Sequence, residues 1–126
     1  MDTHKQVMKD LEKEFGLLMK HSTDGVYLWL DEENMICNDK LAKMFGYSTP
    51  KEMCSKCAFL ENFVAEKDRQ KFSSNYHKSI APLSSPARFK FHAVRKDGST
   101  FLAETDMIPI SFKGHAIAYH FVRKLK

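Results

Sequence analysis

The C-terminal third of the chain alternates between apolar and polar side chains, and this pattern constrains the fold more than any other feature of the sequence. Residues 87–95, 100–110 and 115–123 follow the two-residue period of a β-strand. The segments between them, 96–99 (KDGS) and 113–114 (KG), have the composition of tight turns. The sequence therefore predicts three antiparallel strands joined as a meander.

The first third of the chain combines a helical pattern with two short strands. Apolar residues recur every three or four positions in residues 3–20, which predicts an amphipathic helix. Residues 25–30 are rich in β-branched and aromatic side chains, and 35–37 follow after a polar turn. These two segments predict a hairpin of short strands.

The middle of the chain is predicted to be helical. A capping residue, Asn38 or Asp39, precedes a short helix over 40–45. Short, irregular helical pieces follow over 50–64, and a longer helix over 68–79. Because the strands surround a helical middle instead of alternating with helices, the predicted fold class is α+β.

The length of 126 residues fits one domain, which we expect to comprise residues 23–126 behind a flanking helix in 1–22. No apolar run reaches the ~20 residues of a membrane span, and the N-terminus lacks the apolar segment of a secretory signal. Three cysteines cannot all pair within one chain, which favours a reducing compartment. We therefore expect a cytoplasmic protein with no membrane partner.

The net charge of +4 does not have the distribution expected of a nucleic-acid-binding protein. Basic residues exceed acidic ones only near the C-terminus, where Arg88 and Lys90 alternate with Phe89 and Phe91. This alternation is typical of the solvent-exposed face of a strand. We therefore expect no nucleic-acid partner.

Six short motifs, in this order, resemble those of the PAS domain family. They are TDGV at 23–26, NDKLA at 38–42, FGYS at 45–48, VAEKDR at 64–69, RKDGS at 95–99 and VR at 122–123. The resemblance implies a five-stranded antiparallel sheet with short helices on one face and an N-terminal amphipathic helix. It implies a sensory or interaction module, not an enzyme, with an internal cavity for a small ligand. It also implies an output domain or a partner signalling protein.

Strand parity predicts which side chains line such a cavity. Phe89, Phe91 and Ala93 are predicted to face inward, because the residues that alternate with them are mostly charged. For the last strand, the register of the PAS family places His120 inward. Small residues on this wall leave volume, and a few polar groups give a ligand something to bind. The predicted ligand-binding residues are Phe72, Tyr76, Phe91, Ala93, Phe101, Ala103, Thr105 and His120. The alternative is that large side chains simply fill this volume.

The resemblance disfavours two coloured cofactors. The residues after Cys57 resemble those of the flavin-binding branch of the family, but the flavin-binding asparagines of that branch correspond to Ala93 and Ala103. The axial histidine of the haem-binding branch corresponds to Phe72, and His77 lies on a different helix face. We expect neither flavin nor haem, and an unidentified small molecule as the ligand.

The motif formed by Cys54 and Cys57 is the only thiol pair with a recognisable spacing. A zinc site would also need Cys37 and His77, which have no motif spacing, so we expect no metal. A thiol redox protein using Cys54 and Cys57 stays open as an alternative function. A second alternative is a PAS module that binds no ligand and serves only protein interaction.

The apolar stripe of residues 3–20 must be covered either by the domain or by a partner chain. It is wider than a short leader on a small domain needs. We therefore predict a homodimer whose interface includes Val7, Leu11, Phe15 and Leu18.

Overall fold

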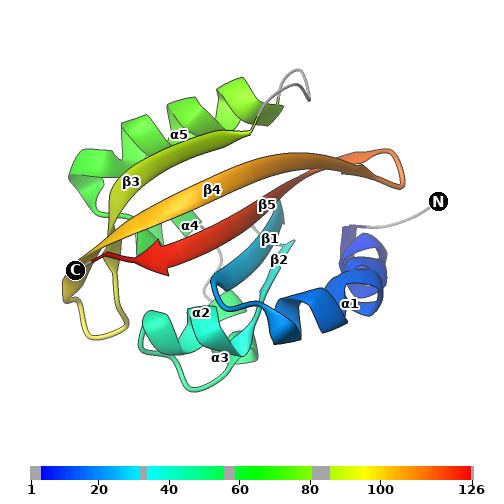
Figure 1. The fold of residues 1–126 in the computed structure, drawn as a ribbon, viewed down its shortest axis with the longest axis horizontal. Helices are drawn as coiled ribbons and strands as arrows, with labels where there is room; N and C mark the ends of the chain where they lie inside the picture. The colour runs from blue at the N-terminus through cyan, green and yellow to red at the C-terminus, as the bar shows by residue number, and fades with distance from the viewer. Residues whose placement is uncertain (1–3, 32–33, 56–58, 81–85, 126) are drawn as a thin grey trace.

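A five-stranded antiparallel sheet in the order β2-β1-β5-β4-β3 forms the centre of the structure (Figure 1). The computed structural model describes residues 4–31, 34–55, 59–80 and 86–125. The strands are β1 (Gly25–Asp31), β2 (Asn34–Cys37), β3 (Ala87–Val94), β4 (Thr100–Phe112) and β5 (His115–Lys124). The helices are α1 (His4–His21), α2 (Asp39–Met44), α3 (Pro50–Cys54), α4 (Phe59–Phe63) and α5 (Glu66–Ile80). The predicted α+β class and five-stranded sheet are confirmed.

The three C-terminal strands form the predicted meander. Strand β4 pairs with β3 from Ala87↔Met107 to Val94↔Thr100, and with β5 up to Phe112↔His115. Two consecutive residues with positive φ, Lys113 at 50° and Gly114 at 80°, make the second turn. A two-residue turn of this kind matches the twist of antiparallel strands. The last strand, β5, also pairs with β1. This pairing joins the N-terminal hairpin of β1 and β2 to the C-terminal meander in one sheet.

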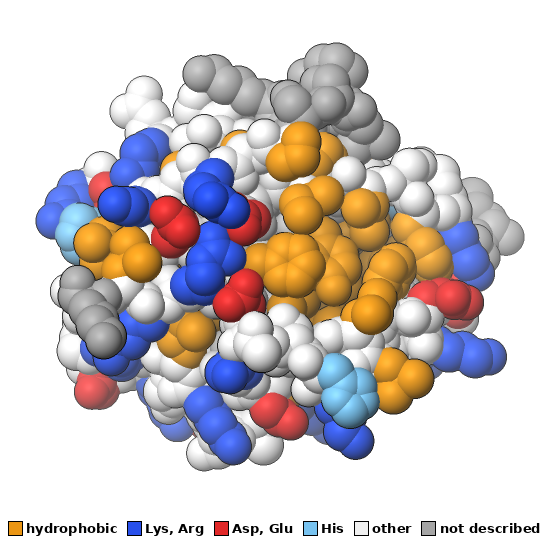
Figure 2. Space-filling view, viewed as in Figure 1, with side chains coloured by type: hydrophobic (Ala, Val, Ile, Leu, Met, Phe, Trp, Pro, Cys, Tyr) orange, Lys and Arg blue, Asp and Glu red, His pale blue; other side chains and the backbone are white. Residues whose placement is uncertain are grey.

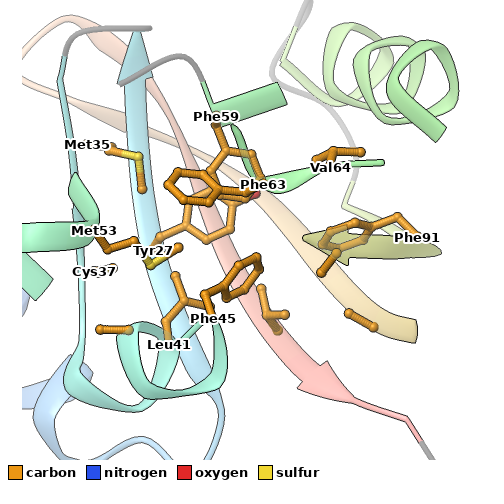
Figure 3. Close-up of a cluster of buried hydrophobic side chains, with 14 of the residues drawn as sticks. Tyr27, Met35, Cys37, Leu41, Phe45, Met53, Phe59, Phe63, Val64 and Phe91 are labelled. Atoms are coloured by element: carbon orange, nitrogen blue, oxygen red, sulfur yellow. The ribbon is translucent and has the colours of Figure 1, made fainter. Parts of the chain in front are cut away.

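The inner face of the sheet and helices α2–α5 enclose the main hydrophobic core (Figure 3). Aromatic rings from several elements meet there: Tyr27 of β1 stacks on Phe59 of α4 with ring centroids 4.4 Å apart. Phe63 of α4 contacts Phe59 at 5.1 Å and Phe45, next to α2, at 5.7 Å. Aromatic packing therefore holds α4 on the sheet.

Helix α1 covers part of the outer face of the sheet. Val7 and Leu11 are fully buried in a cluster with side chains of β1 and β5. This corrects the prediction that Val7 and Leu11 face a partner chain, because the sheet of the same chain covers them. Phe15 is half-buried, whereas Leu17 and Leu18 are 73% and 62% exposed.

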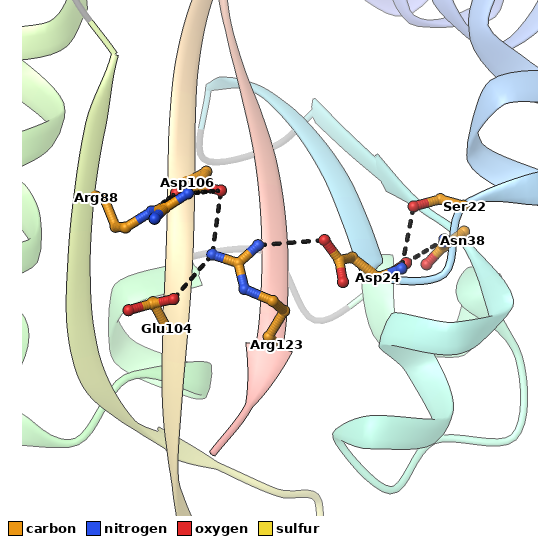
Figure 4. A network of polar contacts seen from close by, with 7 residues as sticks. All are labelled: Ser22, Asp24, Asn38, Arg88, Glu104, Asp106 and Arg123. Atoms are coloured by element: carbon orange, nitrogen blue, oxygen red, sulfur yellow. Dashed lines mark hydrogen bonds and ion pairs between the residues drawn. The ribbon is translucent and has the colours of Figure 1, made fainter.

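Another part of the outer face carries an ion-pair network across three strands (Figure 4). The Arg123 guanidinium of β5 contacts Asp24 before β1 at 3.2 Å, and Glu104 and Asp106 of β4 at 3.0 and 3.1 Å. Asp106 also pairs with Arg88 of β3. Hydrogen bonds from Arg88 and then from Arg123 hold the pKa of Asp106 below its usual value.

The side chain of Asn38 joins three elements at one point. Its Oδ1 atom accepts hydrogen bonds from the backbone N–H of Val26 at 3.0 Å and of Leu41 at 2.9 Å. Its Nδ2 atom donates to the carbonyls of Met19 at 2.9 Å and Asp24 at 3.1 Å. One buried amide thus caps α2 and fixes the start of β1 and the end of α1.

We expect Asn38→Ala to lower the free energy of unfolding by ~3 kcal/mol or more, because buried backbone groups lose their partners. The matched control is Asn75→Ala on α5, whose Nδ2 donates to the Lys71 carbonyl at an exposed site. We expect the control to change stability by less than ~0.5 kcal/mol. Urea unfolding of both variants measures the difference, and equal losses would contradict the role assigned to Asn38.

Candidate functional site

A pocket of about 460 Å³ lies between the inner face of β1 and β5 and the helices α4 and α5. Six of the ten lining residues carry aromatic or imidazole rings, Glu61, Arg69 and Ser73 add polar side chains, and the volume suits a small molecule. The lining residues are Tyr27, Trp29, Phe59, Leu60, Glu61, Arg69, Phe72, Ser73, Tyr76 and His120.

Strand pairing brings the two central rings of the pocket together. Tyr27 of β1 and His120 of β5 are register partners, and both point to the inner face. Their rings therefore stack with centroids 3.9 Å apart and planes 9° apart. Two residues further along β1, Trp29 points to the same face and meets Tyr76 of α5 edge to face at 4.9 Å.

Two lining residues carry buried polar atoms that have no hydrogen-bond partner among the described residues: His120 Nε2 and Tyr27 Oη. The Nδ1 atom of His120 lies 3.2 Å from the Ala118 carbonyl, to which it must donate its proton. In the neutral ring, Nε2 is therefore a hydrogen-bond acceptor. Because buried polar groups are normally paired, the unpaired acceptor beside this pocket is an exception that needs an explanation.

Burial keeps both of these groups uncharged. His120 is 1% exposed, and this desolvation lowers its pKa to about 3. Burial likewise raises the pKa of Tyr27 well above its usual value. At neutral pH the two rings thus present polar atoms without charge.

The Asp-Arg pair at the start of α5 positions one wall of the pocket. Arg69 donates to three backbone carbonyls in and after α4, those of Leu60, Glu61 and Val64. Asp68 accepts from the backbone N–H of His92 at 2.6 Å and contacts the same residue's ring at 2.8 Å. These contacts tie α5 to α4 and to β3, so the helix that carries Phe72 and Tyr76 is fixed at both sides.

The family model of the PAS domain matches residues 23–123, which include the pocket and all of the sheet except Lys124. The chain belongs to the PAS domain family. PAS domains are in general sensory and signal-transducing modules without enzymatic activity. No curated protein matches the chain.

Solved PAS domains have the same fold. A PAS domain from a two-component sensor histidine kinase has a TM-score of 0.68 at 19% identity, over 93% of this chain and 99% of that one. A PAS domain from Colwellia psychrerythraea has a TM-score of 0.73 at 14% identity, over 92% and 98%. The PAS-B domain of Drosophila melanogaster Cycle, with bound ethylene glycol, has a TM-score of 0.66 at 9% identity, over 80% and 99%. At these identities the similarity shows the fold alone.

Three of the eight predicted ligand-binding residues line the pocket of this PAS domain: Phe72, Tyr76 and His120. The other five are buried on the inner side of the sheet but do not line this pocket, and their role in ligand binding stays a prediction: Phe91, Ala93, Phe101, Ala103 and Thr105. The space beside the alanines is occupied by rings, because Phe45 packs on Phe101 at 5.3 Å and Phe72 on Phe91 at 5.1 Å. In this half of the sheet, the packing agrees with the alternative of a core filled by large side chains.

The sequence analysis missed the wall contributed by β1 and α4. Tyr27 and Trp29 alternate along the first predicted strand, so parity could have placed both on one face. Their facing follows from the pairing of Tyr27 with His120, which joins segments far apart in the sequence. Phe59 lies in a short helix whose position depends on tertiary packing.

Metal and thiol predictions have separate outcomes. Cys57 lies outside the described residues, so its proximity to Cys54 stays a prediction. Within the described part of the chain, no group of three or more His, Cys, Asp or Glu side chains is placed to hold a metal ion. The expectation that neither haem nor flavin binds also stays a prediction.

None of the described helices is long and apolar enough to cross a membrane.

The buried His120 predicts how stability depends on pH. Its folded-state pKa of about 3 lies below the ~6.5 of an unfolded histidine, so protonation favours the unfolded chain. The stability that depends on a neutral His120 is present above pH ~6.5 and is lost as pH falls toward 3. Between pH 7 and pH 5, we expect the wild type to lose ~2 kcal/mol more than His120→Gln. Urea unfolding at the two pH values tests this, and parallel losses would contradict the buried, neutral state.

Proposed function

We propose that this PAS domain senses a small, uncharged, largely apolar molecule that carries an N–H or O–H donor. The observation that carries the proposal is the unpaired Nε2 acceptor of the buried His120 beside an aromatic pocket. The neighbouring Tyr27 hydroxyl, which can donate or accept, supplies a second polar contact.

The electrostatics at the buried end of the pocket, around His120, favour an uncharged ligand group. The low pKa of His120 makes the imidazolium costly, so an anion would find no positive charge at the inner end. Arg69, the one cation among the lining residues, is engaged by backbone carbonyls. The walls instead offer ring faces for stacking, and a planar apolar ligand uses these best.

A matched pair of probes tests the ligand class. Indole and N-methylindole have the same ring system, but only indole has an N–H that can donate to Nε2. We expect indole to bind at least ~tenfold more tightly, because the unmethylated ring satisfies a buried acceptor. NMR titration measures both affinities and reports whether signals of Trp29 and Tyr76 move.

His120→Phe is the matched variant for this test, since it keeps an aromatic ring and removes the acceptor. We expect it to bind the two probes with similar affinity. Equal affinities for the wild type, or no shift at pocket residues with either probe, would contradict the proposal.

We also infer a second role, homodimerisation through the outer face of the sheet. Figure 2 shows apolar side chains gathered on this face over β4 and β5, beside the charged network. The half-buried members are Ile108, Ile110, Phe112 and Phe121, and Phe15 of α1 borders them through contacts with Phe112 and Tyr119. A patch of this kind is commonly an interaction surface, and a second copy of the chain would cover it.

Light scattering tests the dimer. Phe121→Glu places a charge in the patch, and Leu18→Glu tests the part of the predicted helical interface that is exposed. We expect a dimeric wild type, a monomeric Phe121→Glu, and a dimeric control, Lys71→Glu on α5. A dimer that survives Phe121→Glu would place the interface elsewhere.

The remaining roles follow from the sensory function. We propose that the chain acts without catalysis and passes the state of its pocket to an output domain or a partner signalling protein. The odd number of cysteines supports a location in the cytoplasm.

A further inference from the structure

Two cysteines that lie far apart in the sequence meet away from the ligand pocket. Cys37 is the last residue of β2 and Cys54 is the last residue of α3. Their Sγ atoms are 3.6 Å apart, close enough for an S–H···S hydrogen bond. Both are free thiols; Cys37 is buried, whereas Cys54 is half-buried.

We propose that Cys37 and Cys54 form an oxidisable dithiol, which a hydroperoxide converts into a disulfide within the chain. The proposal is independent of the ligand pocket. It differs from the alternative with Cys54 and Cys57, because the partner of Cys54 here is the cysteine that the fold brings into contact with it.

A groove gives hydrogen peroxide access to the cysteine pair. Cys37 and Cys54 line a groove of about 1070 Å³ formed by residues of α1, α2 and α3 and of the segments beside them. Charged side chains of both signs line the same groove: Lys20, Lys40, Lys43 and Lys51, with Glu12 and Asp39. The hydrogen bond with Cys37, which lowers the pKa of Cys54, outweighs the charge of Glu12, which acts to raise it.

The two thiols are unequal, which assigns their roles. The hydrogen bond with Cys37 lowers the pKa of Cys54, and Cys54 is the more accessible of the two. The same hydrogen bond, together with burial, raises the pKa of Cys37. Because the thiolate is the nucleophile, Cys54 attacks the peroxide and Cys37 resolves the product.

The reaction proceeds in two steps. The Cys54 thiolate attacks one oxygen of hydrogen peroxide; an S–O bond forms, the O–O bond breaks, and the leaving hydroxide takes a proton to become water. The sulfur of Cys37 then attacks the resulting sulfenic acid; the S–S bond forms, and a second water leaves with the proton of Cys37. In total, two thiols lose two electrons and two protons, and one peroxide is reduced to two waters.

Formation of the disulfide between Cys37 and Cys54 needs only a small movement of the two sulfur atoms. A disulfide has an S–S distance of about 2.05 Å, so the sulfurs must approach by about 1.5 Å from their present 3.6 Å. Cys37 directly precedes Asn38, whose amide joins α1, β1 and α2. The bridge would therefore connect α3 to the junction that holds the N-terminal helix.

Mass spectrometry of the full chain with Cys57→Ser tests the pair without the third cysteine. After hydrogen peroxide treatment and blocking of free thiols, we expect a mass lower by two hydrogen atoms and no alkylated cysteine. Peptide mapping should find Cys37 linked to Cys54, and dithiothreitol should restore both thiols. Two free thiols, a sulfinic acid without a bridge, or a bridge only between chains would overturn the proposal.

Single substitutions in the same background test the assigned roles. In Cys37→Ala, the sulfenic acid of Cys54 has no resolving thiol, so dimedone should trap it. In Cys54→Ala, we expect Cys37 to react with peroxide at least ~tenfold more slowly than Cys54 does in Cys37→Ala, because Cys37 is buried. Equal rates would overturn the assignment. Peptide mapping of the oxidised wild type decides the pairing even if a variant fails to fold, and a Cys54–Cys57 bridge there would contradict the proposal.

Discussion

The four hydrogen bonds of the Asn38 amide are the interaction on which the rest of the structure depends. They fix the end of α1, the start of β1 and the start of α2 at one buried point. Close packing supports this junction, because a Cβ atom at Gly25 would lie 2.8 Å from Leu41 Cδ1 and 3.2 Å from Leu41 Cα. The family motifs TDGV and NDKLA are therefore the two halves of one contact. It sets the position of β1, and with it Tyr27 in the pocket.

The two faces of the sheet have different surroundings. On the inner face, pairing of β1 with β5 brings Tyr27 and His120 into a stack, and burial keeps both rings uncharged. On the outer face, α1 covers one part, ion pairs around Arg123 cover another, and apolar side chains remain between them. A ligand and a second chain would thus contact opposite sides of the same strands.

Local patterns predicted the elements of this fold well, whereas the extent of the pocket depends on long-range packing. The turn at Lys113 and Gly114 follows from turn composition, and a cap at Asn38 or Asp39 follows from residue type. The inward facing of His120 follows from the register of the PAS family, because strand parity alone does not choose the face. Strand parity could not tell which part of the inner wall is hollow, because rings such as Phe45 fill the space beside the alanines. Nor could the stripe of α1 show whether the sheet or a partner covers it.

The central claim is that the pocket ends on a neutral imidazole whose free nitrogen accepts a hydrogen bond. Long-range ¹H–¹⁵N NMR spectra of the six histidines at pH 7, with His120 assigned by substitution, test this most directly. The structure predicts that His120 is uncharged, with its proton on Nδ1 and a lone pair on Nε2. A proton on Nε2, or a charged ring, would contradict the account of the pocket.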